Sequence, residues 1–218
     1  MTAVSTTPDP AGTAPRERNR RGEGGRLRAE ILAGAAELLD ETGNEQAVTL
    51  RAVARRVGIA APSIYGHFPD REAILLAVVQ EAFAELGEAL HTVDDAAGPG
   101  AAARLRTLCA AYLDFAATRP QRYQVMFGGL WNAGQALETA AVTPAEVTGL
   151  GQDALAVLST ALAACVAEGS SASTDVPADT IALWLGLHGL AHQRAVTAAF
   201  PWPADIVERL VSSLAQLT

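Results

Sequence analysis

Apolar residues recur at helical spacing along most of the chain, and this pattern predicts an all-α fold. The first apolar stripe starts near Arg26 and is ended by Gly43. It consists of Leu27, Ile31, Ala35, Leu38 and Leu39. No alternating run of apolar and polar residues is flanked by hairpin turns, so no β-sheet is predicted.

Two short helices are predicted next. Thr49 is a good N-cap for a helix over 50–57, whose apolar residues Leu50, Val53, Ala54 and Val57 share one face. Gly58 supplies a tight turn, and a second helix is predicted over 61–67. Two amphipathic helices joined by a glycine turn describe a helix-turn-helix, in which the second helix enters the DNA major groove.

The helices that follow are longer. A helix starts at Pro69-Asp70, with a buried stripe through Phe83, and the Gly98-Pro99-Gly100 sequence ends it. Further helices are predicted at 101–118, 120–128, 144–168, 177–199 and 203–216. The expected organisation is a disordered Arg-rich arm at 1–24, a three-helix DNA-binding domain at 25–84, and a helical ligand-binding and dimerisation domain at 85–218.

Charge divides the chain in the same way. The net charge is −8 and all 16 basic residues are arginine, but residues 1–71 sum to +1 and residues 72–218 to −9. The acidic body argues against an architectural protein that coats nucleic acid. The arm arginines are expected to enter the minor groove or follow phosphates, with a merely solvated arm as the alternative. They are Arg16, Arg18, Arg20 and Arg21.

The composition and motifs also indicate the cellular compartment and whether catalysis is expected. Cys109 and Cys165 are too few for a disulfide scaffold and are interpreted as buried small apolar residues. Neither an uncharged apolar run of membrane-spanning length nor a signal-peptide core is found, so a cytoplasmic protein without a membrane partner is expected. No nucleophile elbow, phosphate loop or paired-carboxylate motif is present, so no enzyme activity and no cofactor are expected.

The helix-turn-helix leaves a distinct set of residues facing outward. Val53, Ala54, Val57, Ile59, Ile64 and Phe68 are expected to lock the two helices together, with small residues Ala54 and Gly58 at the crossing. The outward side chains can donate hydrogen bonds to phosphates or contact base edges. They are Thr49, Arg51, Arg55, Ala61, Pro62, Ser63, Tyr65 and His67.

The stretch from Tyr65 to Leu75 carries a family resemblance. Tyr65-Gly66-His67-Phe68, followed by Asp70-Arg71-Glu72 and then Ile74-Leu75, resembles the end of the DNA-binding module in the TetR/AcrR family of bacterial regulators. The resemblance covers about residues 26–80. It implies that Tyr65 and Arg71 grip phosphates and that Ala61 to Ser63 read bases. Gly66 departs from the larger residue common at this position in the family.

The same resemblance implies a ligand pocket in the C-terminal helices. Pockets are lined mainly by apolar and aromatic side chains, and the candidates are Tyr112, Phe115, Tyr123, Met126, Phe127, Trp131, Trp184 and His188. Trp184, His188 and Gly189 look like the Trp-His-Gly signature of one subgroup of such domains. His188 and His192 lie one helical turn apart, but no third ligand lies near them in sequence, so no metal is expected.

A homodimer through the helices 177–199 and 203–216 is predicted. Val207, Leu210, Val211, Leu214 and Leu217 would leave an apolar stripe exposed on a monomer, and Gly186 and Gly189 permit close helix approach. The predicted function is a ligand-responsive regulator, a repressor released from a palindromic operator when ligand displaces the helix at 72–92. Alternatives are an activator, a ligand-independent regulator and, more remotely, a small helical enzyme.

Overall fold

The computed structural model describes residues 24–96, 98, 100–128 and 131–218, and every regular element in these ranges is helical. Besides two 3-10 turns, η1 (Glu45–Ala47) and η2 (Ala61–Ser63), the helices are α1 (Gly24–Thr42), α2 (Leu50–Val57), α3 (Arg71–Asp95), α4 (Ala101–Thr118), α5 (Pro120–Phe127), α6 (Ala133–Glu138), α7 (Pro144–Thr148), α8 (Gln152–Ala167), α9 (Val176–Val196) and α10 (Ile206–Leu214). The all-α prediction is confirmed. The arginines of the predicted arm lie outside the described residues.

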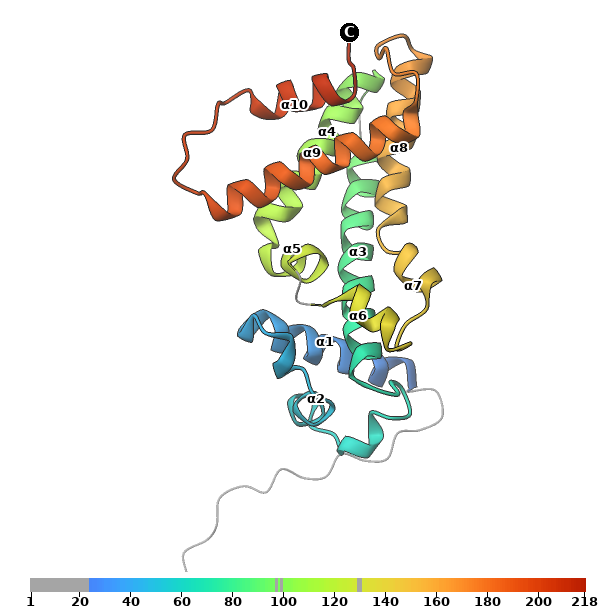
Figure 1. The fold of residues 1–218 in the computed structure, drawn as a ribbon, viewed down its shortest axis with the longest axis vertical. Helices are drawn as coiled ribbons and strands as arrows, with labels where there is room; N and C mark the ends of the chain where they lie inside the picture. Colours follow the sequence, from blue (N-terminus) through green and yellow to red (C-terminus); the bar gives the residue numbers. More distant parts are fainter. Residues whose placement is uncertain (1–23, 97, 99, 129–130) are drawn as a thin grey trace, which may run out of the picture.

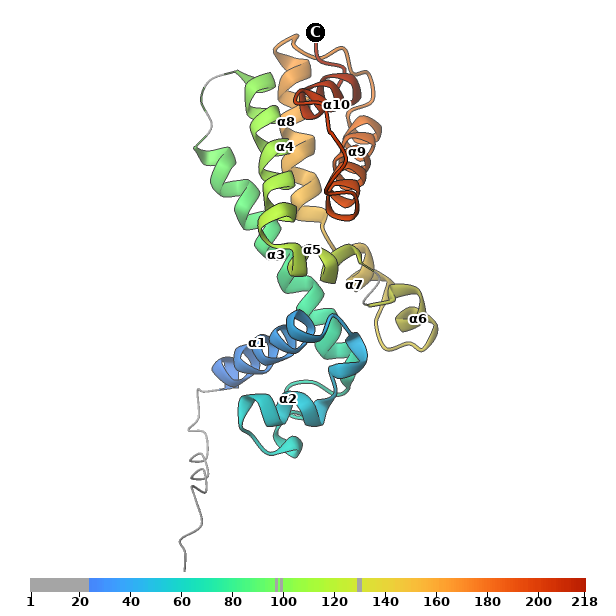
Figure 2. The same ribbon diagram turned by 90° about the vertical axis from the view of Figure 1, so that its left-hand side faces the viewer.

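Helix α3 is the axis of the molecule. It runs along the long direction of the fold, with α1 and α2 around its N-terminal end (Figure 1). Helices α4, α8, α9 and α10 gather around its other end (Figure 2). The Asp70 carboxylate caps α3 by accepting a hydrogen bond of 2.8 Å from the Ala73 N–H.

Local sequence explains why α2 lies against α1. The Thr49 hydroxyl accepts a hydrogen bond of 3.1 Å from the Ala52 N–H, and Gly58 ends α2 at a φ of +72°. The expectation that Gly58 allows the close helix crossing is wrong, since a Cβ there would have nothing within 4 Å. Gly34 of α1 has that role instead, because its Cβ would lie 2.7 Å from Val57 Cγ2.

The segment predicted as a helix over 61–67 is only partly helical. Residues Ala61–Ser63 form the 3-10 turn η2, and residues 64–67 form a hydrogen-bonded turn. Pro62 has no N–H to donate, Gly66 favours non-helical conformations, and so short a helix gains few hydrogen bonds after its costly first turn. Burial of Ile64 and Phe68 holds the segment in place.

The predicted helix over 144–168 is two helices. Gly151, at a φ of +72°, separates α7 from α8. The stretch Pro144–Ala167 is the one described candidate for a membrane span by length and hydropathy, with 33% of its apolar window buried in the fold. Gly151 interrupts this stretch, and α8 packs against α3, α4 and α9, as a core helix does.

The remaining boundaries agree more closely, with short additions. Helix α4 spans the predicted 101–118, whereas α9 ends at Val196 and α10 begins at Ile206, both inside their predicted ranges. The short elements η1 and α6 were not expected from the sequence.

The two main apolar cores share α3, and a small third cluster joins Leu76 of α3 to Ala136 and Val142. The N-terminal core is formed mainly by α1, α2, the turn after it, and α3 from Ile74 to Ala82. The C-terminal core takes Leu86 and Leu90 from α3 and is completed by α4, α5, α8, α9 and α10. Cys109 and Cys165 are free thiols in the C-terminal core, as the sequence predicts, and burial raises the pKa of Cys109 to about 12.

Candidate DNA-binding surface and effector cavity

The helix-turn-helix presents most of its predicted contact residues to solvent. The exposed ones are Thr49, Arg51, Arg55, Pro62, Ser63 and Tyr65, while Ala61 and His67 are half-buried. Tyr65 is 60% exposed, which is unusual for so large a ring and leaves its hydroxyl accessible to a partner. The residues expected to lock the motif do so, because Val53, Ala54, Ile64 and Phe68 are buried and Val57 and Ile59 pack against them.

The arginines of α2 divide into two kinds. Arg56 donates hydrogen bonds to Glu37 at 3.2 Å and to Glu41 at 2.7 Å, both on α1. The hydrogen bond from Arg56 holds the pKa of Glu41 below its usual range. Arg51 and Arg55 form no ion pair or hydrogen bond with another described residue. Two guanidinium groups on α2 are therefore available for an external anion.

Arg71 has a different position from the one the resemblance implies. Its guanidinium donates to the Val48 carbonyl at 3.1 Å, the Glu45 carbonyl at 2.9 Å and the Glu72 carboxylate at 2.7 Å. Most of its hydrogen-bonding capacity is thus spent on the loop before α2. Arg71 fixes the start of α2 to the start of α3, and we expect this to be its main role.

A partly enclosed cavity lies in the C-terminal part of the fold. Its volume is about 140 Å³, and it is bounded by α3, α4, α5, α8 and α9. Tyr112, Phe127 and Trp184 of the predicted ligand residues line it. The sequence did not single out the other lining residues, which are Phe83, Leu86, Leu150, Gly151, Ala154, Leu155 and Leu158. Phe83 and Leu86 belong to the α3 stripe, which predicts burial but not a cavity wall.

Five predicted ligand residues lie elsewhere. Phe115 is buried in the C-terminal core beneath Arg119, whose guanidinium carbon is 5.4 Å from its ring centre. Met126 packs between the two cores, and the Trp131 indole donates a hydrogen bond of 3.1 Å to Glu72 at the start of α3. Tyr123 and His188 stand behind the cavity wall rather than on it. A sequence pattern of aromatics cannot distinguish these places.

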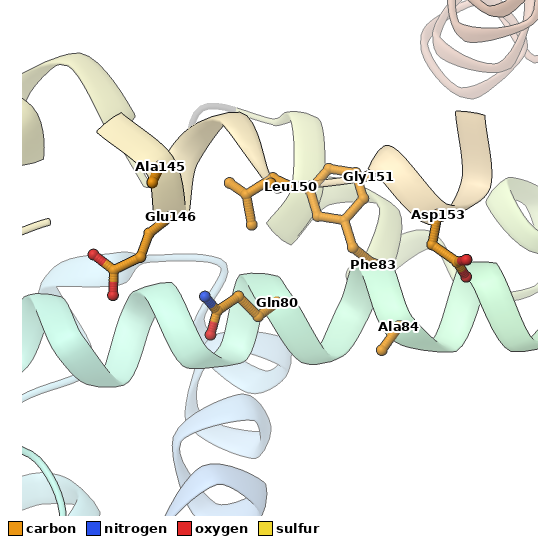
Figure 3. Close-up of a pocket in the computed structure, with 9 residues that line it drawn as sticks. Gln80, Phe83, Ala84, Ala145, Glu146, Leu150, Gly151 and Asp153 are labelled. Carbon is orange, nitrogen blue, oxygen red and sulfur yellow. The ribbon is translucent and has the colours of Figure 1, made fainter. Parts of the chain in front are cut away.

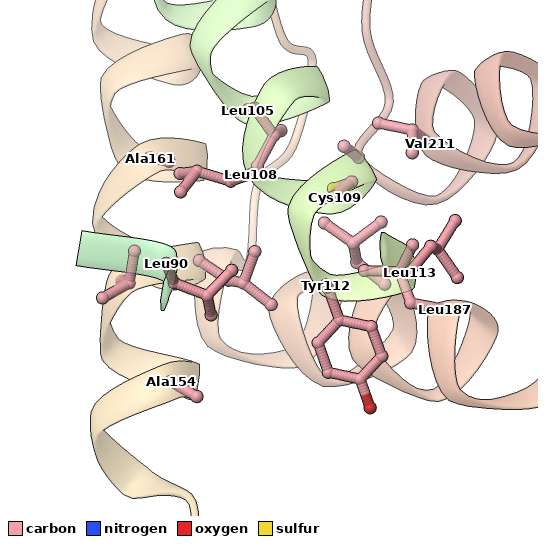
Figure 4. Packing of buried hydrophobic residues seen from close by; sticks show 14 of the residues in the cluster. Leu90, Leu105, Leu108, Cys109, Tyr112, Leu113, Ala154, Ala161, Leu187 and Val211 are labelled. Carbon is pink, nitrogen blue, oxygen red and sulfur yellow. The ribbon is translucent and has the colours of Figure 1, made fainter. Parts of the chain in front are cut away.

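A chain of polar groups runs behind the cavity. The Tyr112 ring is buried among leucines with its hydroxyl directed away from them (Figure 4). That hydroxyl lies 3.3 Å from the Tyr123 hydroxyl, which lies 2.6 Å from His188 Nδ1. Burial, helped by the nearby His192, lowers the pKa of His188, which favours the neutral imidazole. Tyr112, Tyr123 and His188 thus form one continuous hydrogen-bonded chain.

The aromatic rings around this chain are in mutual contact. Phe127 is 4.6 Å from the His188 ring and 6.1 Å from the Trp184 ring, centre to centre. Burial raises the pKa of Tyr112 to about 12, so this hydroxyl is protonated at neutral pH. Within the described residues, no group of three metal-ligating side chains could hold a metal ion, and His192 is exposed.

The predicted dimer helices use their apolar residues differently from the expectation. Helix α10 folds back on its own protomer, where Val211 is buried and Val207, Leu210, Leu214 and Leu217 pack against the C-terminal core. Gly186 serves this contact, because a Cβ on it would lie 2.3 Å from Leu214 Cδ1. The expectation of an exposed stripe on α10 is wrong. The exposed apolar side chains are on α9, where Ile181 is 50% and Leu185 is 53% exposed.

A helix-turn-helix joined by one long helix to a helical body with a cavity is the architecture of a class of transcriptional regulators. Sequence profiles agree with this class. Residues 31–78 match the profile of bacterial regulatory proteins of the tetR family, and residues 105–217 match a tetracyclin repressor-like C-terminal domain. The chain belongs to the TetR family. No curated protein sequence matches it.

Solved structures show the same fold. A protein with unknown function from Rhodococcus sp. RHA1 is 25% identical, with a TM-score of 0.71 over 90% of this chain and 95% of its own. A tetR-family regulatory protein from Rhodococcus RHA1 is 19% identical, with a TM-score of 0.61 over 87% and 95%. A TetR-family transcription regulator from Marinobacter aquaeolei VT8 is 17% identical, with a TM-score of 0.62 over 90% and 97%.

Proposed function

We propose that this chain is a cytoplasmic repressor without enzyme activity that binds a palindromic DNA operator as a homodimer and is released by a small molecule. The proposal is carried by the exposed arginine side chains of α2. Arg51 and Arg55 have no ion-pair partner among the described residues, and they share the motif with the exposed Tyr65. A surface of free guanidinium and phenol groups suits a phosphate backbone.

The rest of the motif supports a reading of bases. Pro62 and Ser63 in η2 are exposed at its tip, with Ala61 beside them. Small side chains there can approach base edges and thymine methyl groups, and the α2 N-terminus capped by Thr49 offers backbone amides to a phosphate. We assign backbone positioning to Thr49, Arg51, Arg55 and Tyr65, and base contact to Ala61, Pro62 and Ser63, with His67 at the edge of this surface.

The test is fluorescence anisotropy against the DNA that flanks the gene, with a scrambled competitor and a salt series. Arg55→Ala should weaken binding and lower the salt slope by about one unit, because one phosphate contact is lost. Arg56→Ala is the matched control, since Arg56 is paired with Glu37 and Glu41 on α1 and should leave the slope unchanged. Equal effects of the two substitutions would contradict the assigned surface.

The proposed dimer uses the outer face of α9. Ile181 and Leu185 lie one turn apart, and a Cβ on Gly189, one turn further, would meet nothing within 4 Å. Leu185→Asp should therefore give a monomer in sedimentation without unfolding it, because the side chain is exposed in the protomer. Ala163→Asp on the exposed side of α8 is the control. A Leu185→Asp protein that remains dimeric would place the interface elsewhere.

The proposed effector site is the 140 Å³ cavity. Its wall includes Phe83 and Leu86 of α3, the helix that also carries the helix-turn-helix core. A ligand that favours one position of α3 over another would change operator affinity, and a coupling of about 1–3 kcal/mol is sufficient for such regulators.

A further inference from the structure

The cavity has a neighbour with which it shares a wall. A surface groove of about 340 Å³ lies between α3 and the α7–α8 turn, lined on its outer side by Gln80, Ala84, Ala145, Glu146, Gly149 and Asp153 (Figure 3). Phe83, Leu150 and Gly151 line both the groove and the cavity. These three residues are therefore the partition between the groove and the cavity.

Phe83 and Gly151 are fitted to each other across this partition. The Phe83 ring rises from α3 beside the backbone of Gly151 (Figure 3), and a Cβ on Gly151 would lie 2.8 Å from Phe83 Cε1. Gly151 also has a φ of +72°, which disfavours any other residue. On its other side the ring makes an edge contact with Phe127, at 5.4 Å between centres. A single aromatic ring thus stands between the groove and the cavity.

The cavity wall restricts what can enter. None of the described lining residues is charged, and Tyr112 and Trp184 are the ones among them whose side chains contain a polar atom. Transfer of an ionised group into such surroundings is costly, whereas an apolar ring loses nothing. The volume is similar to that of the apolar cavity of about 150 Å³ that accommodates benzene in another protein. The groove, in contrast, carries the carboxylates of Glu146 and Asp153.

We propose that the cavity takes an uncharged ligand with a single apolar or aromatic ring, and that this ligand enters from the groove when Phe83 swings away from Gly151. The proposal rests on the proposed function in that the cavity is taken as the effector site. Phe83 also packs against the N-terminal core, so its movement is transmitted to the part of α3 that supports the helix-turn-helix. The entry gate and the coupling element are then the same side chain.

The class of ligand is tested with three probes of similar shape. Nitrobenzene is neutral, 4-nitrobenzoate is an anion and 4-nitrobenzylammonium is a cation, and each quenches tryptophan fluorescence. Because Trp184 is on the cavity wall, nitrobenzene should give saturable quenching that is lost in Trp184→Phe. The charged probes should bind at least about 30-fold more weakly. Equal affinity for the three probes, or saturable quenching that survives in Trp184→Phe, would overturn the proposed ligand class.

The gate is tested by the rate of entry. In stopped-flow measurements, Phe83→Ala should raise the association rate of nitrobenzene about tenfold or more. Phe83→Leu provides the same test if the smaller residue prevents folding. Gln80→Ala is the matched control, since Gln80 is exposed in the groove but is not part of the partition, and its rate should equal that of the unmodified protein. Unchanged rates in both Phe83 variants would overturn the gate.

The same preparations separate this proposal from the proposed function. Operator binding is measured independently by anisotropy. If the protein binds DNA specifically but the nitrobenzene probes do not behave as expected, only the cavity proposal is rejected. Correct probe results in a chain that binds no DNA specifically would reject the regulator function and support the cavity and its gate.

Discussion

The Trp131 indole N–H donates a hydrogen bond of 3.1 Å to the Glu72 carboxylate, and so connects the segment after α5 to the first turn of α3. Glu72 is also held by Arg71, whose guanidinium binds the loop before α2. The C-terminal part and the DNA-binding part of the chain therefore meet on α3 at the Glu72 network as well as at the Phe83 partition.

Trp131→Phe should destabilise the protein by about 1–2 kcal/mol in urea unfolding, because a hydrogen bond to a charged group is lost. Trp202→Phe removes the same atoms at a different site. The Trp202 Nε1 is buried without a partner among the described residues, so this control should cost clearly less. If the two substitutions cost the same, the Trp131–Glu72 bond contributes nothing.

Arg71→Gln should lower stability by about 1–3 kcal/mol and reduce operator affinity only through loss of folded protein. The reason is that the carbonyls of Val48 and Glu45 and the carboxylate of Glu72 lose a shared charged donor. Urea unfolding and anisotropy at a temperature where the variant is folded distinguish the two effects. A stable Arg71→Gln protein with a lower salt slope would return Arg71 to the DNA-contact surface.

Acidification should destabilise the protein through His188. Burial lowers the pKa of this imidazole in the folded state, so below about pH 6.5 the unfolded chain binds a proton that the folded protein binds only at lower pH. Stability should thus be retained above that pH and fall as pH decreases toward the folded pKa. His188→Phe should flatten the dependence of the unfolding free energy on pH between about pH 7 and pH 5.

Tyr123→Phe is the matched control for this pH dependence. It removes the hydrogen bond to His188 Nδ1 and should cost about 1 kcal/mol at neutral pH. It leaves the imidazole buried, so the pH dependence should persist. A pH profile that is the same in His188→Phe as in the unmodified protein would assign the dependence to other groups.

Gly186→Ala should cost about 1–3 kcal/mol. A Cβ at this position would lie 2.3 Å from Leu214 Cδ1 and 3.3 Å from Leu210 Cδ2, so these packed leucine side chains, or α10 with them, must shift. Gly25→Ala is the control, because Gly25 is also helical but has nothing within 4 Å of its Cβ position. Thermal unfolding that ranks the two alike would show that α10 yields without cost.

Local signals predicted most of the helices. Gly100 and Pro120 mark the limits of α4, and Thr49 and Gly58 mark those of α2, because each acts on its own segment. The prediction of a helix over 61–67 was wrong because the local helical preference is weak there. Burial of Ile64 and Phe68 determines the backbone conformation instead. Such an outcome depends on contacts with other helices, which a pattern within one segment does not contain.

The candidate sites show the same division. Exposure of Arg51 and Arg55 follows from the spacing of α2, whereas the two backbone carbonyls that bind Arg71 lie more than twenty residues away in sequence. The α3 stripe marks Phe83 as buried, but whether a buried ring faces a core or a cavity depends on the volumes of the side chains opposite. For Phe83, the residue opposite is Gly151, which has no side chain and a left-handed backbone conformation.

The continuity of α3 has a consequence for how the protein melts. Its 25 residues form a rod of about 37 Å that supplies side chains to both apolar cores. Neither core can lose its packing without disturbing a helix on which the other depends. Calorimetry should therefore record one heat-absorption peak, with equal calorimetric and van't Hoff enthalpies per cooperative unit, rather than separate melting of a DNA-reading head and a sensing body.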